Sequence, residues 1–258
     1  MARTVRRRRV RPGKVLALAR REFASFWGGP TGALALLVFL GLEGLFFNDS
    51  VASYALANLG AMARGGAFDA TLGMFSVGLS DLGLLLALVS PLATMRAFAG
   101  SAQGGHFDLL VTFPLSGPEL TLGLYASALA SLSLLALLGL APYALLLAMG
   151  VGSPALLLSS AIGLVLAVSA FAGLGLAVGS LTRKPVATAL TTLGVLGFLW
   201  AVGWAAPYLQ GHAHAAAKAL ALGPRLARFT LGLVDLNDAL YFLALTVCPL
   251  AAARAGSR

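Results

Sequence analysis

Long apolar stretches, separated by short polar segments, run through most of the chain. A helix needs about 20 apolar residues to cross the hydrocarbon core of a bilayer, and most of these stretches are close to that length or longer. The pattern therefore predicts an all-α fold, that of a polytopic membrane protein. Six membrane spans are predicted, over residues 31–48, 72–95, 120–149, 154–181, 186–208 and 237–253.

Two of the predicted spans are irregular. The third contains Pro142 after Gly139, and because proline removes a helix hydrogen bond we expect a kink or a break there. The last span is short, roughly 25 Å at 1.5 Å per residue, and residues from 230 onward are candidates to extend it.

The segments between the spans are short. Residues 49–71 are predicted to form a loop, and the sequence HAHAAAKALAL is predicted to form a surface helix that ends at Gly223-Pro224. No internal repeat is present in the sequence, and no soluble segment is large enough to hold a core of its own. Residues 14–258 are therefore expected to form a single transmembrane domain.

A basic tail and an amphipathic helix are predicted to precede the first span. Nine of the 18 Lys and Arg residues lie within the first 21 positions, and residues 1–13 are expected to be a disordered cytoplasmic tail. Residues 14–27 predict a helix in the membrane interface, and a cytosolic extension of the first span is the alternative. The break at Gly28-Gly29-Pro30 favours the interface. The apolar side of this helix holds Leu16, Ala19, Phe23, Phe26 and Trp27, and its polar side holds Lys14, Arg21 and Ser25.

The composition supports a membrane protein and decides its orientation. Charged residues make up 10% of the chain, whereas soluble proteins carry roughly 25%. With both termini cytoplasmic, 14 of the 18 Lys and Arg residues lie on the cytoplasmic side, as the positive-inside rule requires. Topology thus accounts for the net charge of +9, and no nucleic-acid partner is expected. Usage rich in Leu, Ala and Gly suits a bacterium of high genomic GC, so the expected location is a bacterial cytoplasmic (inner) membrane.

No motif in the chain predicts catalysis. Nucleotide hydrolysis would need the pattern G-x-x-x-x-G-K-[ST], and among the three lysines only Lys14 follows a glycine, without the rest of the motif. Ser180 and Lys184 could be taken for a catalytic dyad, but Lys184 lies in a turn where topology alone explains it. His212 and His214 supply only two ligands, which do not make a metal site. We expect no catalytic residue, no metal and no cofactor on this chain.

Two acidic residues fall within predicted spans, where inserting a charge costs about 2.5–3.5 kcal/mol. Asp81 lies near the middle of the second span, and Glu43 lies toward the outer end of the first. They indicate a polar translocation path or a proton site. Alternatively, the boundary is displaced by a turn or two and Asp81 caps a helix near the outer surface. Gly175 and Gly179 form a G-x-x-x-G pattern, which is typical of close helix packing.

The segment from Arg96 to Gly123 connects the second and third spans on the cytoplasmic side. It holds small polar residues and the sequence His106-Phe-Asp-Leu-Leu110, followed by a turn bracketed by Pro114 and Pro118. A short helix there, held by a span on each side, is suited to press against a soluble partner and pass the push into the bilayer.

Residues 91–116, PLATMRAFAGSAQGGHFDLLVTFPLS, resemble ABC-2-type permeases, in which P-L-x-T-M-R-x-F precedes G-T-x-E-L-L-L-T-x-P-V-S. The resemblance covers nearly the whole chain. Other segments that carry it are Arg20-Arg21-Glu22-Phe23 followed by Gly29-Pro30-x-Gly32 (similar to the elbow helix of the family), Ser180-Leu-Thr-Arg183, and Gly232-Leu-Val-Asp235-Leu-Asn-Asp238-Ala-Leu-Tyr241, which is similar to the gliding-motility-associated branch in particular.

The resemblance implies a permease subunit with no catalytic activity of its own, whose ATP and magnesium bind on two partner ATPase subunits. It also implies a second permease copy or paralogue, with an accessory extracytoplasmic subunit and membrane lipids as further partners. ATP hydrolysis would be coupled through the loop after the second span. The coupling residues that it implies are Arg96, Phe98, Gly105, His106, Phe107, Asp108, Leu109, Leu110 and Pro114.

The chain departs from the family pattern at two places. The family usually has charged residues where Gly100-Ser-Ala-Gln103 stands, and an arginine where Asn237 stands. Either the ATPase carries matching changes, or this subunit is the weaker half of a heteromeric pair. Two other functions stay open: a force-transmitting or scaffold complex on the same fold, and a proton-driven secondary transporter that uses Asp81 and Glu43.

Overall fold

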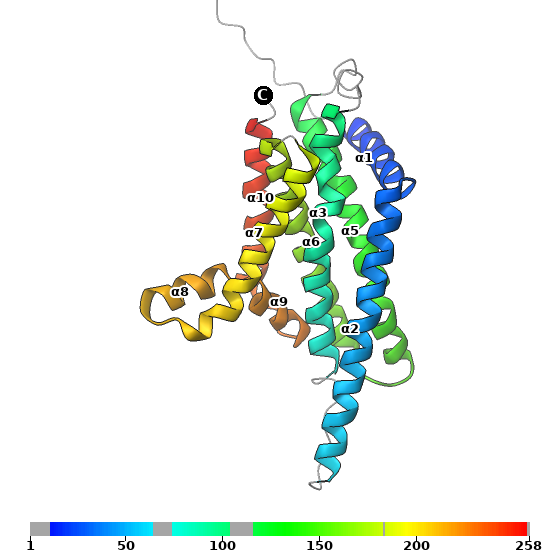
Figure 1. The fold of residues 1–258 in the computed structure, drawn as a ribbon, viewed down its shortest axis with the longest axis vertical. Coiled ribbons are helices and arrows are strands. Elements are labelled where there is room, and N and C mark those ends of the chain that lie inside the picture. The colour runs from blue at the N-terminus through cyan, green and yellow to red at the C-terminus, as the bar shows by residue number, and fades with distance from the viewer. Residues whose placement is uncertain (1–10, 64–73, 104–115, 183, 257–258) are drawn as a thin grey trace, which may run out of the picture.

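The computed structural model describes residues 11–63, 74–103, 116–182 and 184–256, and these form helices and turns without a strand. Among them, six helices are long and apolar enough to cross a membrane, which confirms the predicted number. These helices run alternately up and down in one bundle (Figure 1). In chain order the elements are α1 (Pro12–Trp27), α2 (Pro30–Met62), α3 (Ser76–Gln103), α5 (Gly117–Ala148), α6 (Pro154–Thr182), α7 (Pro185–Ala205), the 3₁₀ turn η2 (Ala206–Tyr208), α8 (Gly211–Leu220), α9 (Gly223–Thr230) and α10 (Leu236–Gly256).

Prolines set several of the helix starts. Proline suits the first turn of a helix because the N–H that it lacks would have no partner there. Helix α2 begins at Pro30, α6 at Pro154 and α7 at Pro185, each within one residue of the predicted start of a span.

Helix α6 packs against α3, α5, α7, α9 and α10, and so forms the centre of the bundle. Its small residues allow this close approach. A Cβ atom on Gly163 would lie 2.5 Å from Cβ of Phe229 in α9, and one on Gly175 would overlap the side chain of Thr94 in α3. Gly179, one turn further along α6, is also buried. Packing of this kind replaces the hydrophobic effect as the attraction between helices in lipid.

Helix α2 is longer than predicted. The loop expected over 49–71 is wrong for its first part, because α2 continues without interruption from Pro30 to Met62. Its 33 residues extend for about 50 Å at 1.5 Å per residue, more than the hydrocarbon core requires. The hydroxyl of Ser50 donates a 2.9 Å hydrogen bond to the carbonyl oxygen of Phe46, so this polar residue is accommodated within the helix. The end of α2 projects beyond the rest of the bundle (Figure 1).

Helix α5 was expected to be kinked or broken at Pro142. The break is absent, because α5 runs as one helix from Gly117 to Ala148. The next residue, Tyr143, is fully buried and its ring contacts Phe47 edge-on, so packing holds the helix together past the proline. Helix α10 does not recruit residues from 230 onward, because a turn with Gly232 at φ +82° separates it from α9.

Helix α1 occupies the stretch for which an interfacial helix was predicted, and it packs along α5. Its buried residues are Leu18, Ala19 and Phe26, whereas Leu16, which was placed on the apolar side, is 70% exposed. The side that α1 turns toward the bundle therefore differs from the apolar side that the sequence predicted, because it includes Leu18 and excludes Leu16.

A tight turn joins α1 to α2 at the predicted Gly28-Gly29-Pro30 break. The carbonyl oxygen of Phe26 lies so close to Gly32 that a Cβ atom there would overlap it. Glycine at position 32 is thus what allows α2 to start directly against the end of α1.

Helices α8 and α9 follow α7, away from the end of the bundle where α1 and the last turns of α10 lie (Figure 1). Helix α8 is the surface helix predicted in HAHAAAKALAL, and it ends before Gly223-Pro224 as expected. The sequence did not predict α9, which begins at that pair.

Candidate functional site

The coupling segment predicted between the second and third spans is described only at its edges. Arg96 and Phe98 lie on α3, which continues to Gln103. The structure thus describes the two helices that the segment connects, α3 and α5, together with their neighbours. The other predicted coupling residues, Gly105, His106, Phe107, Asp108, Leu109, Leu110 and Pro114, lie outside the described residues.

A single carboxylate ties the start of α5 to the start of α1. Glu119, the third residue of α5, accepts a 2.8 Å hydrogen bond from the backbone N–H of Ser116 through Oε2. Its Oε1 accepts a 2.9 Å hydrogen bond from the backbone N–H of Arg11, directly before α1. The side chain is only 4% exposed. A carboxylate at this position satisfies N–H groups at the starts of two helices, which have no partner within the helices themselves.

Packing extends this link along the two helices. Leu18 of α1 lies against Gly123 of α5, where a Cβ atom would come within 2.6 Å of the leucine Cδ2. Helix α1 and the first turns of α5 are therefore joined by both a buried carboxylate and a close contact. A displacement of the start of α5 would carry α1 with it.

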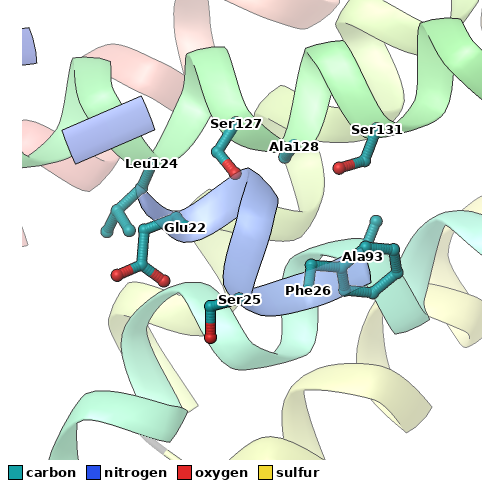
Figure 2. A pocket seen from close by; sticks show the side chains of 8 residues that line it. All are labelled: Glu22, Ser25, Phe26, Ala93, Leu124, Ser127, Ala128 and Ser131. Atoms are coloured by element: carbon teal, nitrogen blue, oxygen red, sulfur yellow. The ribbon is translucent and has the colours of Figure 1, made fainter. Parts of the chain in front are cut away.

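A small pocket of about 30 Å³ lies between α1, α3 and α5 (Figure 2). Its size suits a water molecule. Of the four residues in the predicted elbow motif, Glu22 lines this pocket, Arg20 and Arg21 are exposed, and the ring of Phe23 lies 6.2 Å from that of Trp27. The pocket is lined by Glu22, Ser25, Phe26, Ala93, Leu124, Ser127, Ala128 and Ser131.

The two acids predicted within spans lie on neighbouring helices. Glu43 on α2 is 3% exposed, and Asp81 on α3 is half-buried and within electrostatic range of it. Asp81 lies in the second turn of α3, which begins at Ser76, so it is nearer the start of this helix than its middle and is not its N-terminal cap.

A network of charged residues joins α9 to α10. Asp238, in the first turn of α10 and fully buried, accepts hydrogen bonds through Oδ1 from Arg225 (2.9 Å) and Arg228 (2.5 Å) of α9. Asp235 lies 3.8 Å from Arg228 in a more exposed ion pair. Water does not reach Asp238, so the two guanidinium groups must compensate its negative charge.

Tyr241 extends this network to α8. Its hydroxyl donates a 2.7 Å hydrogen bond to the carbonyl oxygen of Leu220, the last residue of α8. The guanidinium of Arg225 lies 4.3 Å above the tyrosine ring, a cation–π contact. The predicted outer residues Asp235, Asp238 and Tyr241 are therefore close together, and they hold α8 and α9 against α10.

An open groove of about 590 Å³ runs beside the network. His214 lies nearby on α8, with its Nδ1 2.8 Å from the carbonyl oxygen of Ala206. Within the described ranges, no three His, Cys, Asp or Glu residues are grouped so that they could hold a metal ion. The groove is lined by Ala215, Lys218, Ala219, Arg225, Arg228, Asp235, Asn237 and Tyr241.

Three of the residues that organise these sites were not predicted from the sequence. Glu119 could have been found, because Ser116 and Glu119 have the S-x-x-E spacing of a capping box. Arg225 and Arg228 are among the four Lys and Arg residues that the predicted topology leaves on the outer side, and no partner was predicted for them. Their position within 13 residues of two aspartates, in a chain with few charges, indicates a pairing.

The chain matches no family model and no curated protein.

Proposed function

We propose that this chain is the membrane-spanning permease subunit of an ABC-2-type transporter, which couples ATP hydrolysis on separate ATPase subunits to export or to conformational work. The arrangement around Glu119 is the observation that carries the proposal. Residues 104–115 join α3 to α5, and α5 is bonded at its start to α1. A push on this segment would therefore act on two spans and on the helix that precedes them.

The proposed motion is a rigid-body shift at a packed interface. Closure of two ATPase subunits would move residues 104–114 and displace α3 and α5 against the central helix α6. The contact between Thr94 of α3 and Gly175 of α6 is close enough that it would have to slide or separate in such a motion.

The coupling surface expected on this chain is small, because the helix of about three turns predicted over residues 104–114 would offer well under the ~800 Å² per partner of a standard interface. Helix α1, which is bonded to α5, is the best placed of the described elements to enlarge it. We further propose that both termini face the bacterial cytoplasm, that a second permease copy or paralogue completes the pore, and that ATP and magnesium bind on the ATPase.

Changing the charge of the segment, by a reversal at residue 108 or an added charge at residue 109, tests the coupling. In the assembled complex, Asp108→Arg and Leu109→Asp are expected to leave insertion and ATP hydrolysis in place but to abolish the nucleotide-dependent change in distance between α1 and α6, measured between spin labels in lipid vesicles. The matched control is Asp69→Arg, the same reversal in the segment predicted on the other side of the membrane. An unchanged distance response in both segment variants would contradict the proposal.

The scaffold alternative makes a different prediction. A transporter of small molecules should hydrolyse ATP faster when its substrate is added, whereas a force-transmitting complex should not respond to any such compound. The rate of ATP hydrolysis in the presence of candidate lipids separates the two.

A further inference from the structure

Three spans meet around one face of α2. Glu43, Phe47 and Ser50 are spaced four and three residues apart, so they share this face. The ring of Phe47 lies 5.4 Å from that of Tyr143 in α5. A Cβ atom on Gly78 of α3 would overlap the hydroxyl of Tyr143 and lie 3.1 Å from Oγ of Ser50. Helices α2, α3 and α5 are thus in close contact beside Glu43.

Two polar groups at this contact are buried without a partner. Both carboxylate oxygens of Glu43 and the hydroxyl of Tyr143 make no hydrogen bond to any part of the chain that the structure describes. The two residues are 3% and 0% exposed. The hydroxyl of Ser50 is already used, since it donates to the carbonyl of Phe46.

The charges that face Glu43 are of the same sign as an ionised glutamate. Asp81 on α3 lies within electrostatic range of Glu43, and Asp49 on α2 lies within range of Asp81. Among the described residues, Tyr143 on α5 is a further titratable group within electrostatic range of Glu43. None of the ion pairs in the described ranges includes Glu43. Burying an ionised carboxylate without a cation or a hydrogen-bond donor is so costly that such a group takes up a proton instead.

We propose that Glu43 is a proton-binding site of the helix bundle, protonated in the conformation described and able to release its proton to water when α2 moves relative to α3 and α5. The bond that breaks is the carboxyl O–H, and the product is a carboxylate with a hydronium ion. Tyr143, whose hydroxyl has no partner among the described residues, lies within electrostatic range of Glu43 and is the donor that we assign to stabilise the carboxylate after such a movement. The proposal does not depend on an ATPase partner.

Infrared absorption of the full chain in lipid vesicles at neutral pH tests the proposal. A protonated carboxyl group gives a C=O stretching band that ionised carboxylates lack. We expect this band in the unaltered protein and its complete loss in Glu43→Gln, which keeps the size of the side chain. The control Asp81→Asn should retain the band.

A labelling experiment covers the case in which Glu43→Gln does not insert. The chain has three glutamates, and of the other two, Glu22 is half-buried beside the pocket and Glu119 accepts two backbone N–H groups as a carboxylate. Carbon-13 labelling of glutamate in the unaltered protein should therefore shift the band. A band that neither the variant nor the label changes would overturn the proposal. So would a band that appears only after sodium and potassium are removed, because a metal cation would then be the occupant of the site.

Discussion

Asp238→Ala is expected to lower the free energy of unfolding by about 3 kcal/mol, because removing one partner of a buried ion pair leaves the other charge uncompensated. Asp238 is fully buried and bonds to both Arg225 and Arg228. Arg225 is itself only 16% exposed, so its guanidinium would lose its main partner without gaining much water. Chemical unfolding of the chain in detergent micelles measures this change.

Asp235→Ala is the matched control. Its ion pair with Arg228 is 3.8 Å long and about 40% exposed on both sides. Exposed pairs of this kind contribute at most about 1 kcal/mol. Asp235 also accepts a 3.0 Å hydrogen bond from the backbone N–H of Asn237 at the start of α10, a contact of the kind that is typically worth about 1 kcal/mol. The control should therefore lose clearly less stability than Asp238→Ala. Equal losses in the two variants would contradict the role given to Asp238.

Gly175→Leu is expected to have the second large effect, a loss of about 3 kcal/mol at the upper end of the range for overpacked cores. Even a Cβ atom at this position would overlap Thr94, which is fully buried. The larger side chain should therefore force α6 away from α3. Thermal unfolding of the purified chain, together with cysteine cross-linking between these two helices, measures both consequences.

Gly197→Leu provides the comparison for this variant. Gly197 lies on α7, and no atom lies within 4 Å of the position that a Cβ would take. The same substitution there should leave the unfolding temperature nearly unchanged. A comparable loss at Gly197 would show that leucine at any span glycine is harmful, and that the contact with Thr94 is not the cause.

The number of spans was predictable from the sequence, but the length of α2 was not. Hydropathy shows where a chain can leave lipid, and the polar residues from Asn48 onward mark that point in the sequence. A helix does not have to end there, because a hydroxyl such as that of Ser50 can bond back to its own helix. Pro142 did not mark a break in α5 for a different reason, because tertiary packing around Tyr143 outweighs the hydrogen bond that proline removes.

Partners across helices were harder to predict than the helices. The sequence placed Asp235, Asp238 and Tyr241 in one outer segment, but it did not predict that two arginines of an additional helix would neutralise Asp238. Glu43 was placed toward the outer end of the first predicted span. Its burial depends on α3 and α5, which are far from it in the sequence. The pattern of apolar residues within α2 does not predict where these two helices pack.

For the predicted coupling segment, the sequence says more than the structure does. The family resemblance identified its residues, whereas the structure describes only the elements next to it, which are the end of α3, the start of α5 and the start of α1 that is hydrogen-bonded to α5. The coupling function proposed for this segment is therefore tested best by asking whether the chain binds an ATPase subunit.

Isolation of the chain from its own membranes, with a tag after residue 258, is the most direct test of a permease driven by ATP on another chain. Mass spectrometry of the purified assembly should identify an ATPase subunit that carries the G-x-x-x-x-G-K-[ST] motif. This subunit should be present in the same amount as the permease subunits, and its co-purification should depend on bound nucleotide. An assembly that contains no nucleotide-hydrolysing subunit, in mild detergent and with nucleotide present, would contradict the account.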